Sequence, residues 1–337
     1  MRIGILALLV GLMECSRAQA PQINPGIAIS PSPISRCMNL GGALESPTEE
    51  GDWGYIVRKA DLERLREAGF DTIRLPIRWS TRAGLEPPYT LEPAFLERIE
   101  EIIDWSRRAG LNIIVNVHHY EALSEDPDTH EPRLEAIWSQ LALHFAGMPP
   151  NVIFETINEP YGKMTVKRTD QLNARLLEII REFNPNRWVI LGTANWGNLD
   201  ALQESRPEYD PRVMLTYHDY NPFEFTHQGA FWTDPELPTG LSWGTAADVA
   251  DLDERLDEVL AVQDRLRMPV FVGEFGVYEE VPVVERARWT RAMREGMEAR
   301  GLSWCYWDYA TTLKAYDMDA EQWLPEMYEA LISVDAR

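Results

Sequence analysis

The sequence predicts one α/β domain folded as a (β/α)8 TIM barrel. Short apolar, β-branched runs alternate with amphipathic helical patterns along the chain, which is typical of a parallel sheet. The 337 residues give room for eight such units, and no internal linker or repeat divides them. The first strand is followed by Gly-Gly-Ala-Leu-Glu over residues 41–45 rather than by a glycine-rich phosphate loop, so a nicotinamide-binding fold is not favoured.

Eight strands are expected, each a short apolar run bounded by turn-forming or polar residues. Their ranges are 37–40, 72–77, 112–117, 152–154, 188–191, 213–217, 270–273 and 303–306. In a barrel of this kind the active site lies at the carboxyl ends of the strands. The residues directly after each strand are therefore expected to be neighbours in space.

Helices are expected between the strands, with ends marked by prolines and glycines. Their ranges are 58–68, 93–109, 134–145, 169–183, 246–266, 283–299 and, as a closing helix, 321–332. Pro93 in a first turn and Gly110 after a last turn mark both ends of the second of them. Residues 221–244 are rich in aromatic residues, proline and glycine, and are expected to form a long loop.

The first 20 residues have the composition of a secretory signal peptide. Arg2 precedes an apolar run over residues 3–13, which is too short to span a bilayer, and cleavage after Ala18 or Ala20 would fit the small residues there. Residues 21–34 are proline-rich and are expected to form an extended lead-in, so residues 35–337 would be the catalytic domain. The protein is expected to be secreted or periplasmic.

The net charge limits the partners that the chain could bind, and the cysteines raise the question of a disulfide. The formal net charge of −22 argues against nucleic acid and acidic membranes, because both would be repelled, and it suits a neutral substrate and a soluble protein. The protein is expected to be a monomer. Cys37 and Cys305 could pair in an oxidising compartment. Each lies inside a strand-like run, however, which slightly favours two buried free thiols.

Two of the predicted strands end in a glutamate. Glu159 follows the fourth strand in Asn-Glu-Pro, and Glu274 follows the seventh in Gly-Glu-Phe-Gly. Glycoside hydrolysis needs two carboxyl groups, one to protonate the leaving oxygen and one, ionised, to attack or stabilise the anomeric carbon. Arg74 lies among apolar residues of the second strand and must have a partner there. An arginine beside one of these glutamates would keep it ionised.

Polar and aromatic residues follow the other strands as well, and a barrel that needed only stability would not require them. They are Asn39, Glu45, His118, His119, Asn158, Trp196, His218, Tyr220 and Trp307. Asn158 could bond a sugar hydroxyl, and aromatic rings offer flat platforms for sugars. For any one of Trp196, Trp232 and Trp307, packing in the core is an equally good interpretation.

Taken together, these motifs resemble glycoside hydrolase family 5, the cellulase family, in its bacterial endoglucanase branch. The resemblance rests on Asn-Leu-Gly-Gly-Ala-Leu-Glu (39–45), Arg-Leu-Pro-Ile-Arg-Trp-Ser (74–80), Val-Asn-Val-His-His-Tyr (115–120), Asn-Glu-Pro (158–160), the block 218–232, Gly-Glu-Phe-Gly (273–276) and Trp-Asp-Tyr (307–309). It covers almost the whole chain after the signal peptide.

The resemblance implies a retaining endo-β-1,4-glucanase that needs no metal or cofactor. Glu159 would be its acid/base and Glu274 its nucleophile. Arg74 and Tyr220 would bond the nucleophile, and Trp307 would form the floor of the subsite that holds the sugar under attack. The expected substrate-binding set is Asn39, Glu45, Arg74, His118, His119, Asn158, His218, Tyr220, His227, Trp232 and Trp307.

Three alternatives remain open. The same site could serve a β-mannanase, a glucomannanase or a xyloglucanase, since loop shape decides between these substrates. A metal-dependent barrel hydrolase would use His118, His119, His218, Asp219 and His227 as ligands. Residues 39–41 offer no His-x-His after the first strand, and the histidines form no compact ligand spacing. A non-catalytic glycan-binding protein would share the aromatic platforms but need neither glutamate.

Overall fold

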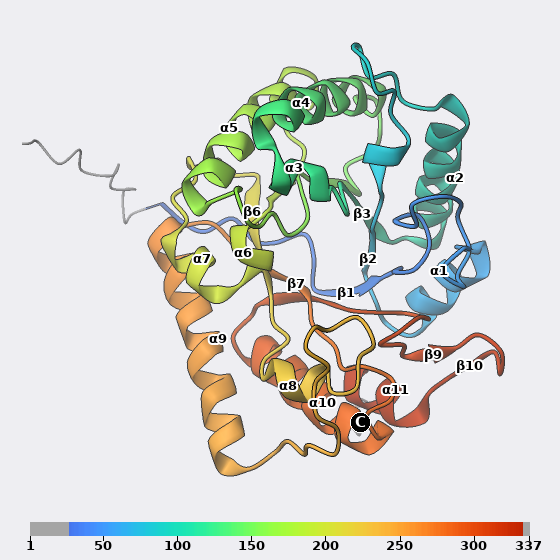
Figure 1. The fold of residues 1–337 in the computed structure, drawn as a ribbon, viewed down its shortest axis with the longest axis vertical. Coiled ribbons are helices and arrows are strands. Elements are labelled where there is room, and N and C mark those ends of the chain that lie inside the picture. The colour runs from blue at the N-terminus through green and yellow to red at the C-terminus, as the bar shows by residue number, and fades with distance from the viewer. Residues whose placement is uncertain (1–26, 333–337) are drawn as a thin grey trace, which may run out of the picture.

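Eight short parallel strands pair side by side in sequence order, and the last pairs with the first. The computed structural model describes residues 27–332, and within them the strands form a closed barrel enclosed by helices (Figure 1). The strands are β1 Arg36–Asn39, β2 Thr72–Leu75, β3 Asn112–Asn116, β4 Val152–Glu155, β5 Val189–Leu191, β6 Val213–His218, β7 Val270–Glu274 and β8 Ser303–Tyr306, followed by a small hairpin, β9 Tyr316–Asp317 and β10 Gln322–Trp323. The predicted (β/α)8 barrel is confirmed.

Helices cover the outside of the barrel and occupy several of its loops. They are α1 Lys59–Glu67, α2 Pro93–Ala109, α3 Glu121–Glu125, α4 Pro127–His144, α5 Val166–Phe183, α6 Ala194–Gly197, α7 Leu199–Glu204, α8 Phe223–Thr226, α9 Ala246–Leu266, α10 Val283–Ala299 and α11 Pro325–Leu331, with one 3-10 turn at Trp79–Thr81. In Figure 1, α1 and α2 lie on one side of the strands, α4 and α5 on another, and α9 and α10 on the remaining sides. None of the helices between residues 27 and 332 has the length and apolar composition that a membrane span requires.

Local signals fix the ends of the helices that the sequence predicts best. In α9, the Thr245 hydroxyl accepts a hydrogen bond from the Asp248 N–H while the Asp248 carboxylate accepts one from the Thr245 N–H. In α2, Pro93 occupies the first turn, and Gly110 ends the helix in a left-handed conformation with φ of 74°. The predicted bounds 93–109, 246–266 and 283–299 are confirmed.

Two apolar clusters, inside and outside the strands, hold the barrel together. The larger one lies between the strands and the surrounding helices. A smaller one alternates with it along the strands, as expected for side chains that point to opposite faces of a sheet, and fills the barrel. Its members are Ile34, Cys37, Ile114, Ile153, Trp188, Ile190, Met214, Phe271 and Cys305.

A buried polar layer lies above this inner apolar cluster. Its members stand two positions after members of the inner cluster on the same strands, and therefore point to the same face. Asn39, Asn116, Glu155 and Thr216 follow Cys37, Ile114, Ile153 and Met214 in this way, and all four are buried. The strands thus change from apolar to polar on their inner face as they approach the carboxyl ends.

The structure corrects several predicted elements. The helix predicted over 134–145 begins at Pro127, because that proline suits a first turn and the helix continues through Pro132. The predicted closing helix starts only at Pro325, after the β9–β10 hairpin. No helix is predicted between the fifth and sixth strands, where α6 and α7 are found, and the predicted loop 221–244 contains the single turn α8.

The preference for two free thiols is wrong. Cys37 and Cys305 are paired neighbours on β1 and β8, the two strands that close the barrel, and a disulfide joins them. The predicted signal peptide, residues 1–20, lies outside the described residues. Residues 27–34 of the predicted lead-in belong to no helix or strand.

Candidate active site

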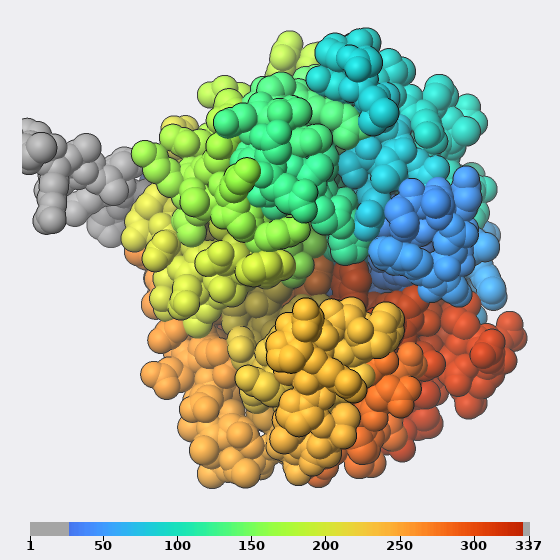
Figure 2. Space-filling view, in the orientation of Figure 1, coloured from blue at the N-terminus to red at the C-terminus, as the bar shows by residue number. Residues whose placement is uncertain are grey.

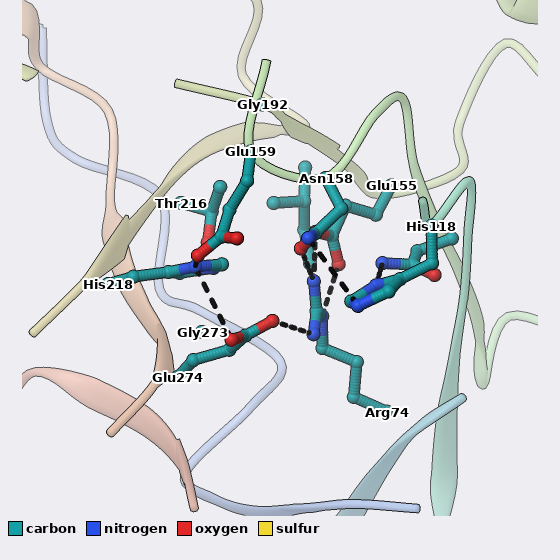
Figure 3. A network of polar contacts seen from close by, with 12 residues as sticks. Arg74, His118, Glu155, Asn158, Glu159, Gly192, Thr216, His218, Gly273 and Glu274 are labelled. Atoms are coloured by element: carbon teal, nitrogen blue, oxygen red, sulfur yellow. Dashed lines mark hydrogen bonds and ion pairs between the residues drawn. The ribbon is translucent and has the colours of Figure 1, made fainter. Parts of the chain in front are cut away.

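Arg74 is the centre of the polar layer and has no exposed surface. Its Nε and Nη2 donate to the two carboxylate oxygens of Glu155, each at 2.7 Å, and its Nη1 donates to Glu274 Oε1 at 2.8 Å. Asn39 and Asn158 accept further hydrogen bonds through their side-chain oxygens, at 2.9 and 2.5 Å. Figure 3 shows Arg74 among Glu155, Asn158 and Glu274. The predicted need for a partner is confirmed, and one guanidinium connects β1, β2, β4 and β7.

The sequence analysis missed Glu155, although this buried residue is bound to Arg74 through both of its oxygens. A signal for it exists in the sequence. Glu155 stands two positions after Ile153 on β4 and so shares its inward direction, which puts a carboxylate inside a barrel where only a buried cation could pair with it.

Glu274 is held at both of its carboxylate oxygens. Arg74 donates to Oε1, and the Tyr220 hydroxyl donates to Oε2 at 2.9 Å. The residue before it is Gly273, and a Cβ at that position would collide with Thr216 Oγ1 and come within 3.0 Å of His218 Nε2. The glycine therefore lets β7 pack closely against β6, and Glu274 is fixed in one orientation beside its predicted partners.

Glu159 lies opposite Glu274 in the same site and is the more open of the two. Its side chain is 26% exposed, compared with 6% for Glu274. Its backbone has φ of 43°, an uncommon conformation for a residue with a side chain and one that occurs often at functional sites. His218 Nδ1 lies 2.6 Å from Glu159 Oε1, so the predicted acid/base has a hydrogen-bonded partner at the end of β6.

His218 links the two glutamates. Its Nδ1 is also 3.6 Å from Glu274 Oε2. Burial alone would lower the pKa of His218, but the charge of Glu274 and the hydrogen bond with Glu159 outweigh it and raise that pKa above its ordinary value. The two carboxyl groups therefore favour the protonated form of the imidazole that lies between them.

Two adjacent histidines form one wall of the site. The ring of His118 stacks on Trp307 with 5.5 Å between centroids, and His118 Nε2 lies 3.5 Å from Asn158 Nδ2. Burial, together with the positive charge of Arg74, keeps the pKa of His118 well below its ordinary value. Burial also lowers the pKa of His119, to about 4. Neutral rings of this kind can exchange hydrogen bonds with sugar hydroxyls.

The loop after β6 brings a second aromatic group to the site. His227 lies 5.0 Å from Tyr220 and 6.1 Å from Trp232, measured between ring centroids. His227 is buried, and burial lowers its pKa to about 4. Trp232 remains 43% exposed, so it is not part of the core. Figure 2 shows this loop, in yellow-orange, at the edge of a hollow in the centre of the view.

Asn39 and Glu45 differ from the other predicted binding residues in position. Asn39 is fully buried, and its amide nitrogen donates to the carbonyl of Gly273 at 3.0 Å while its oxygen accepts from Arg74. Glu45 is also buried, and its two carboxylate oxygens accept hydrogen bonds from the backbone N–H groups of Gly42 and Ala43. Asn39 thus holds Arg74, and Glu45 holds the loop after β1, while the contact of both residues with substrate stays a prediction.

The ligand set predicted for a metal-dependent hydrolase does not gather. In residues 27–332, the one group of three His, Cys, Asp or Glu side chains close enough to share an ion is Glu159, His218 and Glu274. Of the histidines and the aspartate named for that alternative, the group contains only His218. Its other two members are the glutamates predicted to act in glycoside hydrolysis.

The chain is similar in sequence to a known protein family and to several of its members. The model of the family described as cellulase (glycosyl hydrolase family 5) matches residues 39–312. Endoglucanase H of Acetivibrio thermocellus is 33% identical over 316 residues, which cover 91% of this chain and 34% of that protein. Endoglucanase B of Clostridium cellulovorans is 25% identical over 292 residues, which cover 80% of this chain and 65% of that protein. This chain thus spans a third to two thirds of these relatives.

Solved structures superpose on this chain over nearly their full length. Cel5A of Thermotoga maritima, in structures described as complexes with cellobiose and with mannotriose, superposes with a TM-score of 0.87 at 36% identity. The match covers 89% of this chain and 97% of each of those chains. The barrel, the two glutamates at the ends of β4 and β7, and these matches establish that the chain belongs to the cellulase family, glycosyl hydrolase family 5.

Proposed function

We propose that this chain is a retaining, endo-acting glycoside hydrolase that cleaves β-1,4-linked glucan. The observation that carries the proposal is the short distance between the two glutamates, since an oxygen of Glu159 lies within 4.8 Å of an oxygen of Glu274. Retaining enzymes hold their two carboxyl groups about 5–5.5 Å apart, whereas inverting enzymes need about 6.5–9.5 Å to admit a water molecule. The separation in this site suits a nucleophile rather than a bound water.

The surroundings of the two glutamates support their separate roles. Glu274 is bonded by Arg74 and Tyr220, which fix both of its oxygens beside the site and suit it to attack the anomeric carbon. Glu159 is more exposed and exchanges a hydrogen bond with His218, which suits a group that must give up a proton and take one back.

The reaction then has two steps. Glu274 attacks the anomeric carbon and forms a glycosyl ester as Glu159 protonates the departing oxygen, so the glycosidic bond breaks without a free alkoxide. Water next attacks the anomeric carbon of this glycosyl ester, Glu159 accepts the water's proton, and the bond between the anomeric carbon and the Glu274 oxygen breaks, which releases Glu274 as a carboxylate. Asn158 and His118 lie beside the site, where they can bond the hydroxyls of the sugar under attack.

The relatives support β-glucan as the first substrate to test. The curated relatives reported above are named endoglucanases, and Cel5A of Thermotoga maritima has been solved with cellobiose. The same enzyme has also been solved with mannotriose, so a β-mannanase or glucomannanase activity is the second candidate. Secretion and a monomeric state are proposed from the sequence alone, on residues 1–20 and on the net charge.

The first test compares wild type with Glu159→Gln and Glu274→Gln on carboxymethyl cellulose, barley β-glucan and glucomannan. We expect wild type to release reducing ends and each variant to lose activity by about 10³-fold or more, because each lacks one of the two reacting groups. The anomer formed first, followed by proton NMR, should be the β anomer. An α anomer would contradict the retaining mechanism, and full activity of Glu274→Gln would contradict the choice of nucleophile.

A further inference from the structure

Asn116 is a buried amide at the end of β3, two residues before His118. Asn116 has no exposed surface, and His118 has 2%. The backbone carbonyl of Asn116 accepts a hydrogen bond from the indole N–H of Trp79 at 2.9 Å, which helps to hold the residue in place. A buried side-chain amide needs partners for both its oxygen and its nitrogen, so its contacts determine which of the two atoms points in which direction.

The backbone of Ile77 fixes the orientation of this amide. The Ile77 N–H donates to Asn116 Oδ1 at 3.2 Å. A backbone N–H can only donate, so the side-chain atom beside it has to be the oxygen. The other side-chain atom of Asn116 is therefore its NH2 group, and that nitrogen lies 3.1 Å from Nδ1 of His118.

The same reasoning fixes the amide of Asn158 on the other side of the imidazole. Arg74 Nη2 donates to Asn158 Oδ1 at 2.5 Å, and a guanidinium group has no acceptor. The NH2 group of Asn158 is thus the one that lies 3.5 Å from His118 Nε2. An amide donor therefore faces each ring nitrogen of His118.

The imidazole of His118 can accept from only one of these two donors. Burial keeps the pKa of His118 well below its ordinary value, so the ring is neutral and has one acceptor nitrogen. The contact with Asn116 has an ordinary hydrogen-bond length, whereas the 3.5 Å contact with Asn158 is at the limit for one. Asn116 is also the more deeply buried amide, so an unpaired N–H there costs more. The acceptor is therefore Nδ1, and the proton lies on Nε2.

We propose that Asn116 is a positioning residue that fixes His118 as the Nε2–H tautomer and so makes it a hydrogen-bond donor to the sugar under attack. The inference rests on the proposed function. His118 and Asn158 then present two N–H donors 3.5 Å apart, neither of which can accept from the other (Figure 3). Two such donors suit the lone pairs of one hydroxyl oxygen, which accepts from both and donates its own proton elsewhere.

The first measurement is the protonation of His118 in wild type, by NMR of the ring nitrogens. The signals of His118 are assigned by their absence from His118→Ala. We expect Nε2 to carry the proton and Nδ1 to have none. A proton on Nδ1 with a bare Nε2, or a mixture of the two tautomers, overturns the inference. This measurement needs neither a substrate nor a stable variant of Asn116.

The matched variant is Asn116→Asp, which keeps the shape of the side chain and the oxygen that accepts from the Ile77 N–H. A second oxygen, which accepts when ionised, replaces the NH2 group, so Nδ1 should gain a proton and Nε2 should lose its own. We expect kcat/KM on cellopentaose to fall by at least about tenfold, because the site loses a donor. Asn112→Asp adds the same charge at the opposite end of β3 and should change neither the tautomer nor the activity.

Activity should follow the proton on Nε2. An unchanged tautomer in Asn116→Asp, or a loss of activity with Nε2 still protonated, would mean that Asn116 only stabilises the strand. Full activity with a bare Nε2 would mean that the reaction does not use this donor. Each of these results overturns the inference. If wild type hydrolyses no β-glucan, the proposed function fails, whereas the NMR of wild type still decides the tautomer.

Discussion

Arg74 holds together the side chains on which the site's geometry depends. Its guanidinium is buried and bonds two carboxylates, that of Glu155 and that of Glu274, the proposed nucleophile. Burial alone would lower the pKa of Arg74, but Glu155 and Glu274 raise it, so the group stays charged. Because all five N–H donors lie in one rigid fork, a lysine cannot reproduce these contacts.

We expect Arg74→Met to destabilise the fold and abolish activity. Removing the cation leaves the buried Glu155 and Glu274 without their partner, which should lower the free energy of unfolding by about 3–5 kcal/mol. Urea unfolding measures this change. The matched control is the double variant Arg74→Met/Glu155→Leu, which should regain part of the stability, because the best-buried carboxylate is gone, but none of the activity. A double variant as unstable as the single one would contradict this account.

His218 provides a test of the electrostatics around the two glutamates. Its pKa is raised above the ordinary 6.5 by the charge of Glu274 and the hydrogen bond with Glu159, against the lowering effect of burial. Its titration, followed by NMR of the ring nitrogens, should therefore have a midpoint above 6.5 in wild type. In Glu274→Gln the midpoint should fall, because the neutral amide no longer stabilises the imidazolium.

His118 is the internal control for this titration. Burial keeps its pKa well below the ordinary value, so His118 should stay neutral over the same pH range in both proteins. A midpoint for His218 that is unaffected by Glu274→Gln would show that the two groups do not interact across 3.6 Å as the structure implies.

For single residues, the sequence predicts which of them have chemical roles, but not which side chains bond one another. Arg74 is recognisable as a charge that needs a partner, and both glutamates are found from their positions after strands. The partnership of Arg74 with Glu155 depends on the register of β2, β3 and β4, which brings residues 81 positions apart together. Without that register, the alternation along β4 indicates that Glu155 shares the direction of Ile153, but not which cation pairs with it.

Among the elements, the loops after β1 and β8 each contain a buried acid that bonds the backbone of its own loop. Glu45 bonds the backbone of the first loop, and Asp308 accepts hydrogen bonds from the Thr311 and Leu313 N–H groups in the second. Burial raises the pKa of Glu45 to about 8, and burial raises that of Asp308 to about 7. Each acid is thus protonated in the folded protein at pH values where it is ionised in the unfolded chain.

These raised pKa values make stability fall as pH rises. For Glu45 the loss begins near its ordinary pKa of 4.5, grows up to about 8 and is constant above that. We expect wild type to lose on the order of 1–4 kcal/mol of unfolding free energy between pH 5 and pH 9 from this group. In Glu45→Gln the dependence should be weaker, although the amide offers only one acceptor oxygen and so lowers stability by a constant amount. Parallel curves for the two proteins, from urea unfolding at several pH values, would contradict the prediction.

Elements with strong local signals are predicted well, and elements set by tertiary packing are not. The capping box of Thr245 and the Pro93–Gly110 pair define α9 and α2 within the sequence itself. The turn of α6 has no such signal, because its left-handed residues end at Gly197, which lies against His218. The β9–β10 hairpin likewise replaces the start of a predicted helix, with Glu321 in a left-handed conformation before β10.

Across the whole molecule, the change from apolar to polar side chains along the inner face of the strands produces both the stable core and the active site. The inner face of the strands is apolar towards their amino ends, where Ile114, Ile153 and Met214 pack, and polar towards their carboxyl ends. A closed barrel is needed for this arrangement, since only closure brings β1 and β2 beside β7 and β8 and so lets Arg74 reach Glu274. Function in this fold therefore depends on the pairing of the first strand with the last.

The disulfide lies at that closure. Cys37 and Cys305 are 268 residues apart in sequence, and their bond joins β1 to β8 inside the barrel. A cross-link that closes so long a loop restricts the unfolded chain, and its loss should lower the free energy of unfolding by about 2–5 kcal/mol. The sequence could not settle this pairing, because two buried thiols in strands look the same until the barrel is closed.

A double-mutant cycle distinguishes the disulfide from two buried thiols. Because Cys37→Ala and Cys305→Ala each remove the same bond, either single variant should lose nearly as much stability as the double variant. Two independent thiols would instead give losses that add, since each alanine would leave its own small cavity in the inner cluster. Urea unfolding of the four proteins without reductant measures the cycle, and additive losses would mean that barrel closure relies on strand pairing and packing alone.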